Sequence, residues 1–289
     1  MKNIPGVVLM LAGSIAAHAQ YYYKDIVGTQ EINQTIKLYL SNKVTSVEAT
    51  GFDSEGMKNS DFSEVQTFLA ARNIWKISNR NKTTISNQYY RFDPKGLLTS
   101  ITDSSASLIS TTTFTYDERN NPVVIKNTVS DADDSINQSE THQWFYNNDG
   151  KPMRMLRIVN GNDTTDVRFT LDEKGNVIQE WPFIRKISRE KTYYYYDDQG
   201  RMTDIVRFNV KARRLLPDYM FEYSSNNQLV QKITTLSSSS LPYLTWRYAY
   251  NDKGLKSKEA TYIKTRGGSS NSEWTMTGKI EYVYGFGGN

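Results

Sequence analysis

The sequence predicts an all-β protein, an antiparallel β-meander of consecutive hairpin repeats that forms one large twisted sheet, open or partly closed. Three observations predict it. A tight-turn signature follows an apolar, usually aromatic, residue seven times between residues 89 and 284. The segments between the turns alternate their side chains with the two-residue period of a strand. The second connection of each unit varies in length and is mostly polar, as loops are.

Residues 1–19 are predicted to be a signal peptide. A short basic start precedes the apolar stretch IPGVVLMLAGSIAA, and Ala17-His18-Ala19 has the small-x-small form of a signal-peptidase site. The alternatives are an N-terminal membrane anchor and a buried first strand. Cleavage would start the mature chain at Gln20 and export it to the periplasm, the cell surface or the medium. The chain has no cysteine, which excludes a lipoprotein anchor, disulfides and thiolate metal sites.

Residues 20–88 have no clear assignment. Phe52-Asp53-Ser54-Glu55-Gly56 matches the turn signature, but the gap to Phe92 is too long for one unit. The stretch SDFSEVQTFLAARN (60–73) begins with a potential N-cap and carries apolar residues at helical spacing. A short helix is therefore one interpretation of 60–73, and an extra strand is the other.

Seven turns define the repeat of residues 89–284. Each has an apolar residue, then Asp, Asn or Ser, then Gly or Asn three positions later, and these residue types cap a tight turn and tolerate left-handed backbone. Their spacing of 24 to 30 residues fits two strands, a tight turn and a looser connection. The seven turns span residues 92–96, 116–120, 146–150, 171–175, 196–200, 223–227 and 250–254.

The run KTYYYYDDQGRM (191–202) shows the pattern most clearly. In a strand, Tyr194 and Tyr196 face one side of the sheet and the other two tyrosines face the opposite side. Asp197 to Gly200 then form the turn. The stretch YLTWRYAY (243–250) alternates in the same way, with one face richer in large apolar groups. The sheet is therefore predicted to have one buried face and one half-wet face. The last five residues, GFGGN, are predicted to be a flexible tail.

The pattern Y-D-x-x-G resembles the YD repeats of the RHS family, whose members are secreted or surface proteins with long antiparallel sheets built from such hairpins. The resemblance covers about residues 89–284. Here the period is longer and looser, several turns use Asn or Ser in place of Asp, and no C-terminal toxin domain follows. The family's cargo-enclosing shell is therefore not expected for this chain, and an open or partly closed sheet is.

No catalytic, cofactor-binding or metal-binding residue is predicted, and no cofactor. His142 is the single histidine after the signal peptide, and no G-x-S-x-G elbow or G-x-x-x-x-G-K loop is present. A packed or surface strand residue is therefore the interpretation of His142. Enzyme activity is left uncertain, with a non-enzyme favoured, because the carboxylates that the pattern places lie in turns.

Aromatic rings give the one functional lead among 20 tyrosines and 5 tryptophans. Rings on a sheet can stack against sugars, although cross-strand ring pairs also stabilise a sheet by themselves. Tyr194, Tyr196, Trp246 and Tyr248 are the candidate ligand-binding residues, with a glycan or an envelope protein as the partner. A net charge of +4 with interspersed signs argues against nucleic acid. The ligand and the oligomeric state stay open.

The function predicted from these observations is that of an exported, non-enzymatic repeat protein that binds or scaffolds at the cell envelope. One alternative is an outer-membrane β-barrel, which shares the signal peptide, the amphipathic strands and the short turns at one end. Asp204, Lys232, Lys256 and Lys258 lie at candidate lipid-facing positions, so membrane insertion is disfavoured without being excluded. A second alternative is a carbohydrate-active enzyme on the same sheet.

Overall fold

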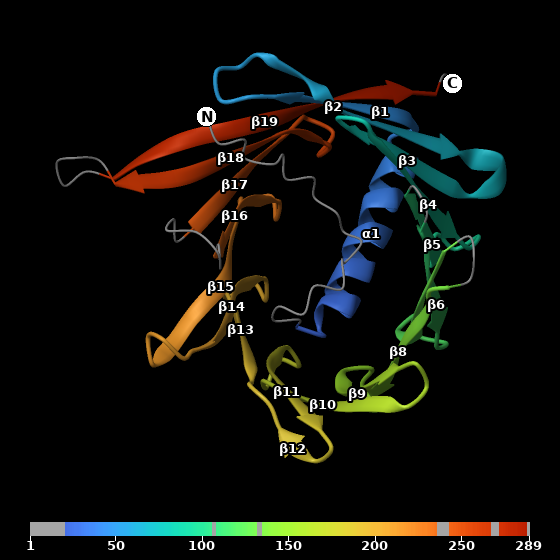
Figure 1. Ribbon diagram of the computed structural model, residues 1–289, viewed down its shortest axis with the longest axis vertical. Helices are drawn as coiled ribbons and strands as arrows, with labels where there is room; N and C mark the ends of the chain where they lie inside the picture. Colours follow the sequence, from blue (N-terminus) through green and yellow to red (C-terminus); the bar gives the residue numbers. More distant parts are fainter. Residues whose placement is uncertain (1–20, 106–107, 132–134, 236–242, 267–271, 288–289) are drawn as a thin grey trace.

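The computed structural model describes residues 21–105, 108–131, 135–235, 243–266 and 272–287, and Figure 1 shows them as a ring of strands around one long helix. The described residues form 19 strands in a single sheet whose neighbours pair antiparallel, one α-helix and one 3-10 helix. The predicted all-β antiparallel fold class is confirmed. The elements are α1 (Lys24–Ser41), β1 (Val44–Phe52), β2 (Lys58–Leu69), η1 (Ala70–Arg72), β3 (Ile74–Asn81), β4 (Thr84–Phe92), β5 (Leu98–Ser105), β6 (Leu108–Tyr116), β7 (Pro122–Asp131), β8 (Asn137–Tyr146), β9 (Pro152–Val159), β10 (Asp163–Leu171), β11 (Val177–Ile184), β12 (Ile187–Ser188), β13 (Thr192–Tyr196), β14 (Met202–Asn209), β15 (Arg214–Tyr223), β16 (Leu229–Thr235), β17 (Tyr243–Tyr250), β18 (Lys256–Arg266) and β19 (Ser272–Phe286).

The sheet closes into a barrel. Each wall strand pairs with the next one along the chain, and β1 pairs with both β2 and β19, where Val47 lies opposite Tyr284. The two-residue β12 pairs only with the end of β11, and β11 pairs directly with β13. The wall of the described chain therefore has 18 strands, the 19 of the sheet less β12. Closure leaves the wall without the unpaired edge strands of an open sheet.

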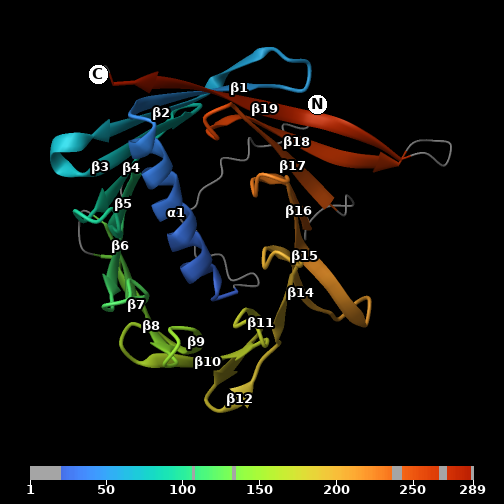
Figure 2. The ribbon, with the colours of Figure 1, turned by 180° about the vertical axis from the view of Figure 1, so that it is seen from behind.

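Helix α1 lies inside the barrel, closer to the wall of β3–β8 than to the wall of β14–β17 (Figures 1 and 2). Ile26, Ile32 and Ile36 are spaced to share one helix face, and all three are buried. Ile26 packs in a cluster with Trp144, and the other two pack in a cluster with Trp75. The core therefore lies between one face of α1 and one side of the wall. No helix among the described residues is both long and apolar enough to cross a bilayer.

The structure corrects the sequence interpretation of the N-terminal part. The sequence predicts no helix at 24–41, where α1 lies. The helix considered for 60–73 is wrong, because residues 58–69 form β2 and only Ala70–Arg72 turn helically. The extra-strand interpretation is confirmed, with Val65 opposite Glu48 on one side and Ser78 on the other. Residues 44–81 thus belong to the same wall as the repeats, and residue 88 marks no boundary in it.

The predicted tail is also different. Strand β19 continues to Phe286, which pairs with Val44, and the amide of Gly287 donates to the carbonyl of Lys43 at 2.8 Å. The tail prediction is therefore wrong for residues 285–287. Residues 288–289 and the predicted signal peptide, residues 1–19, lie outside the described residues.

All seven predicted turns are present, and the turn at Asp53 adds an eighth. After the four tyrosines, Oδ1 of Asp197 accepts hydrogen bonds from the amides of Gln199 and Arg201, and the amide of Gly200 donates back to the Asp197 carbonyl. Gly200 has a φ of +76°, a left-handed conformation that glycine adopts without strain. The first position of the turn thus needs a short polar acceptor, and the fourth needs Gly or Asn.

The tyrosine before the turn has a role that the pattern did not reveal. Tyr196 Oη donates to the carbonyl of Val177 at 2.8 Å, and Tyr250 Oη donates to the carbonyl of Leu229 at 2.8 Å. Each acceptor lies five positions after the first polar residue of the preceding turn, so the bonds repeat along the turn end of the barrel. We call them the tyrosine ladder, which also includes Tyr116, Tyr146, Tyr223 and Tyr284.

We predict that Tyr196→Phe lowers the free energy of unfolding by about 1 kcal/mol, because the Val177 carbonyl loses its hydroxyl donor while the ring is kept. Tyr195→Phe is the matched control, since that neighbouring ring is 49% exposed on the outer side. It should change the same free energy by less than about 0.5 kcal/mol. Urea unfolding followed by circular dichroism measures both. Equal losses in the two variants would show that the ladder adds no stability.

Candidate functional site

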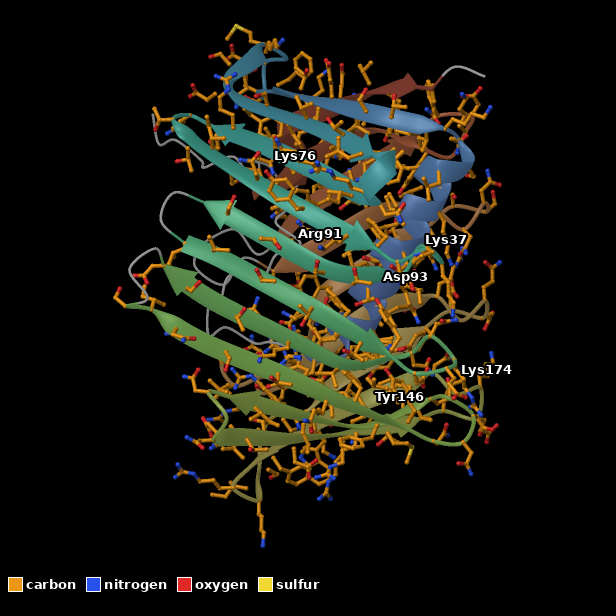
Figure 3. All side chains as sticks on the ribbon, turned by 90° about the vertical axis from the view of Figure 1, so that its right-hand side faces the viewer. Lys37, Lys76, Arg91, Asp93, Tyr146 and Lys174 are labelled. Carbon is orange, nitrogen blue, oxygen red and sulfur yellow. The ribbon has the colours of Figure 1, made fainter. Side chains whose placement is uncertain are left out.

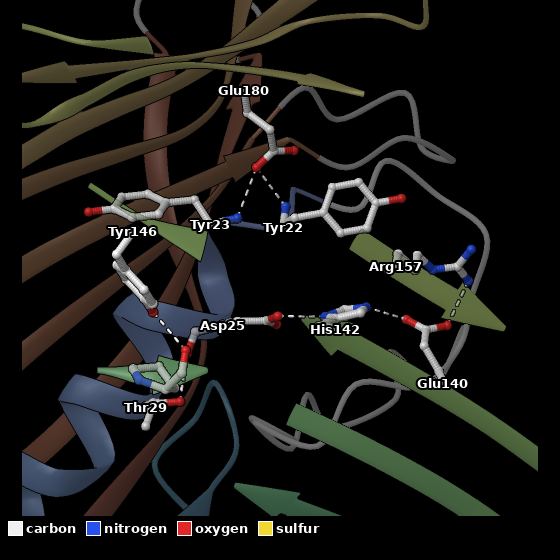
Figure 4. Close-up of polar contacts among 10 residues, drawn as sticks. Tyr22, Tyr23, Asp25, Thr29, Glu140, His142, Tyr146, Arg157 and Glu180 are labelled. Carbon is white, nitrogen blue, oxygen red and sulfur yellow. Dashed lines mark hydrogen bonds and ion pairs between the residues drawn. The ribbon is translucent and has the colours of Figure 1, made fainter. Parts of the chain in front are cut away.

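The start of α1 is bonded to the wall through Glu180 on β11. Amides at the start of a helix have no partner inside it, and Oε2 of Glu180 accepts the amides of Tyr22 and Tyr23 at 2.7 and 2.8 Å (Figure 4). The hydroxyl of Tyr194 donates to the same oxygen at 2.8 Å. Glu180 has no exposed surface. Burial raises the pKa of its carboxyl to about 7, against the effect of these hydrogen bonds.

A chain of ion pairs joins the first turn of α1 to β8 and β9 (Figure 4). Asp25 Oδ2 lies 2.5 Å from Nδ1 of His142, whose Nε2 lies 2.8 Å from Oε1 of Glu140. Arg157 Nη2 donates to the other oxygen of Glu140 at 2.6 Å. Burial disfavours a charged imidazole, but Asp25 and Glu140 outweigh it and raise the pKa of His142 to about 9. Burial likewise opposes charge on Glu140, yet His142 and Arg157 hold its pKa down at about 2.

These residues fix the helix and do not form an open site. We call Asp25, Glu140, His142, Arg157 and Glu180 the helix latch. His142 is 6% exposed and Glu180 is 0% exposed, so these two groups are closed to solutes in the folded barrel, while Glu140 and Arg157 are half-buried. The interpretation of His142 as a packed strand residue agrees with this position. Its partner Asp25 could not be identified from the sequence, because it belongs to the unpredicted helix, whereas Glu140 lies two positions before His142 on the same face of β8.

The opposite face of α1 is wet. Gln30, Glu31 and Gln34 are exposed although strands surround the helix on all sides in both end-on views (Figures 1 and 2). At 100° per residue this stripe lies opposite Ile32 and Ile36. An exposed face on an enclosed helix means that water reaches the lumen between α1 and the far wall.

Charged side chains from α1 and from the far wall influence one another across this part of the lumen. Burial raises the pKa of Glu31, while the positive charges of Lys232 on β16 and Lys256 on β18 lower it. Burial lowers the pKa of Lys232, while Glu31 and Glu259 raise it. Lys256 Nζ lies 3.1 Å from Oε2 of Glu259. Glu31 is thus exposed to water and still surrounded by enough protein to desolvate it partly.

The outer wall carries charged side chains among exposed apolar ones such as Ile85, Phe145 and Val283. Met155 on β9 and Val167 on β10 point inward with no exposure. Their neighbours along the two strands, Arg154, Asp166 and Arg168, therefore point outward. Arg154 Nε lies 2.7 Å and Arg168 Nη2 lies 3.4 Å from the carboxylate of Asp166.

Cations also cover the outward rings. The guanidinium of Arg168 lies 4.7 Å from the ring of Phe183, and Lys191 Nζ lies 4.0 Å from the ring of Trp181. Lys76 lies on the side of the barrel that Figure 3 faces, with its Nζ 5.7 Å from the ring of Tyr89. Such pairs are typical of a surface that meets water.

The four candidate ligand-binding residues all point inward and do not form one open face. Tyr194 is 2% exposed and Trp246 is 4% exposed, so both are packing residues. Tyr196 belongs to the tyrosine ladder. Tyr248 is half-buried in the wet part of the lumen, where Lys256 Nζ lies 5.2 Å from its ring. The structure therefore places one of the four beside the lumen charges.

Comparison with known proteins identifies no family. No protein-family model matches the chain, and no curated protein matches it. Among solved structures, a porin-like protein from Bacteroides uniformis is 9% identical, with a TM-score of 0.44 over 84% of this chain and 98% of that one. Chains in a TcdB2-TccC3-TEV structure and in a Photorhabdus luminescens Tc holotoxin pore are 11% and 10% identical, with TM-scores of 0.33 and 0.27. This chain covers only 15% and 16% of those two.

The function predicted from the sequence is wrong. An exported, non-enzymatic repeat protein that binds or scaffolds needs a sheet face open to its partner, and here β1 closes the sheet against β19. The apolar face is the inner one and is covered by α1. A closed antiparallel barrel fits the alternative of an outer-membrane β-barrel better than the repeat-scaffold interpretation.

We predict that the free energy of unfolding falls as the pH rises from about 6.5 to about 9, the interval between the ordinary pKa of a histidine and the raised pKa of His142. The folded-state pKa lies above the ordinary histidine pKa of about 6.5, so this stabilisation is complete below about 6.5 and is lost as the pH rises to about 9. Its size is on the order of 3 kcal/mol. Urea unfolding of the unchanged chain and of His142→Gln across this range measures it. The variant should lack this fall, and parallel curves would refute the latch.

Proposed function

We propose that this chain is a β-barrel of the cell envelope that works through its lumen, a hydrated compartment beside a fixed helix that admits small charged solutes. The observation that carries the proposal is the exposed stripe of Gln30, Glu31 and Gln34 on a helix that the wall encloses. Lys232 on the far wall belongs to the same space, because its pKa responds to the charge of Glu31.

The latch supports this proposal, because it holds α1 to one side. Asp25 and Glu180 bind the start of the helix to β8 and β11, and Asn33 Oδ1 accepts the amide of Leu98 at 2.9 Å farther along. A helix fixed against one wall leaves the other wall facing water. The internal helix thus limits the lumen without filling it, as a partial plug does.

The charges on the outer wall bear on whether that wall faces water or lipid. Its closed sheet and strands of 8 to 10 residues over much of the wall would allow a bilayer crossing. An outward Arg or Lys at the bilayer midplane, however, costs about 2–4 kcal/mol. Arg154 and Arg168 point outward, and so does Lys258, the neighbour of the inward Glu259. We therefore place the barrel in water, with the outer-membrane barrel as the second candidate, favoured by closure. Export would follow from the predicted signal peptide.

Thiol labelling tests whether the lumen admits solutes. The chain has no cysteine, so Gln34→Cys creates a single thiol on the wet face of α1. We predict that a small charged methanethiosulfonate reagent modifies it in the folded protein within minutes, at a rate within about tenfold of that for the unfolded chain. Ile36→Cys, at a position 1% exposed, is the matched control and should react at least about a hundredfold more slowly. Equal protection of both thiols would overturn the proposal.

Detergent dependence tests whether the outer wall of the barrel faces water or lipid. We predict that residues 20–289, produced without the signal peptide, remain β-rich and disperse in buffer without detergent, because the outward charges keep water as their solvent. Light scattering and circular dichroism provide the measurements. Aggregation that only detergent relieves, together with migration on gels that changes on heating, would instead place the wall in the outer membrane.

A further inference from the structure

Two hairpin tips at one end of the barrel gather much of its positive charge. We call them the basic tips: residues 184–191, IRKISREK, join β11 to β13 through β12, and residues 208–215, FNVKARRL, span the β14–β15 connection. Together they hold seven of the chain's 35 basic residues and one of its 31 acidic residues, Glu190. Seven charges less one give the tips +6, against +4 for the whole chain.

The sheet register places the two tips side by side. Thr192, at the start of β13, lies opposite Glu180 on β11 and opposite Arg207 on β14. Strands β11 and β14 continue beyond this row in the same direction, and two strand spacings, about 10 Å, separate them. Both tips lie at the loop end, opposite the tight turns, and project outside the ring of the wall (Figures 1 and 2). One partner can therefore contact both.

The charge of the tips is available to a partner. Six of the seven basic residues are exposed, and none of the six forms an ion pair with a described carboxylate: Arg185, Lys186, Arg189, Lys211, Arg213 and Arg214. The seventh, Lys191, lies over the ring of Trp181.

The first tip carries its charge on strained backbone. Ile184 pairs with Ile187, so Arg185 and Lys186 form a two-residue hairpin loop. Their φ angles are +49° and +66°, a left-handed conformation that Asn-Gly adopts with less strain. Two basic side chains thus occupy positions where the local backbone favours other residues, and such outliers gather at functional sites.

Exposed apolar side chains accompany the charge. Ile187 is 61% exposed and Val210 is 77% exposed. Phe208 lies opposite Leu215 across the second tip, and both are exposed. Basic side chains around exposed aliphatic and aromatic ones are the composition of segments that bind at the interface of a bilayer.

We propose that the basic tips attach the barrel to the surface of an anionic lipid bilayer. The cations approach the headgroup phosphates, and Ile187 and Val210 enter the boundary between headgroups and acyl chains. This inference goes beyond the proposed function and does not depend on the lumen.

A lipid surface fits the tips better than a soluble acidic glycan. A glycan would satisfy the cations but would leave the exposed aliphatic side chains in water. The rings of Trp181 and Phe183, at the base of the first tip, already have Lys191 and Arg168 over them at 4.0 and 4.7 Å, where a sugar would stack.

Vesicle sedimentation tests the attachment. The probes are vesicles of phosphatidylcholine alone and of phosphatidylcholine with about 30% phosphatidylglycerol. Each basic residue near an anionic surface strengthens binding about fivefold. We predict that residues 20–289 bind the anionic vesicles at least about a hundredfold more tightly than the neutral ones, and that about 1 M salt releases them. Removing three charges together, by Lys211→Gln, Arg213→Gln and Arg214→Gln, should weaken binding at least about tenfold.

Matched variants separate the tips from the rest of the surface. Lys95→Gln, Lys174→Gln and Lys253→Gln together remove the same charge from the tight-turn end and should change the affinity less than about threefold. Ile187→Ser should weaken binding at least about threefold. Ile85→Ser, at a position that is also 61% exposed, should leave it unchanged. Circular dichroism confirms that each variant is folded.

Three results would overturn the proposal. One is equal binding of neutral and anionic vesicles, or an equal loss in the turn-end variant. Another is binding that about 1 M salt does not reverse, which would show insertion and favour the outer-membrane barrel. The third is binding of soluble polygalacturonate as tight as that of anionic vesicles and unaffected by Ile187→Ser, which would assign the tips to an acidic glycan.

Discussion

The space inside the closed sheet is the constraint on which the rest of the structure depends. A ring of 18 strands encloses more volume than its inward side chains fill, and an apolar inner face cannot stay wet. Helix α1 resolves half of this problem by burying Ile26, Ile32 and Ile36 against one side of the wall. The other side carries Lys232, Glu259 and tyrosines among its inward side chains, beside aliphatic residues such as Leu244. One element thus creates both the core and the compartment.

The position of the helix requires the latch. A helix that packs along one face could slide or rotate, and burying Glu180 and His142 makes any other placement expensive, because each would lose its partners. The tyrosine ladder acts at the turn end of the barrel and fixes one hairpin against the previous one. Together these contacts hold α1 in one position inside the barrel.

Local features of the fold could be predicted, and long-range ones could not. The turns depend on residues within five positions of one another, as at Asp197 and Gly200, so the sequence shows them directly. Helix α1 has no side-chain cap, contains Gly28, and is held by Glu180 and His142, which lie more than 100 residues away. Closure requires β1 to meet β19. No short-range pattern contains either contact, and the lumen depends on both.

The two faces of the sheet explain why the sequence analysis assigned some charged residues to the wrong face. Alternation separates the side chains of a strand into two sets, but it does not say which set faces inward. The sequence analysis assigned Lys232 and Lys256 to candidate lipid-facing positions, but both side chains point into the barrel, while Arg154 and Arg168 point outward. Charge therefore lies on both faces of the sheet. The outer charges Arg154 and Arg168 pair with Asp166, and inside the barrel Lys256 pairs with Glu259, so alternation alone could not have told these two sets of charges apart.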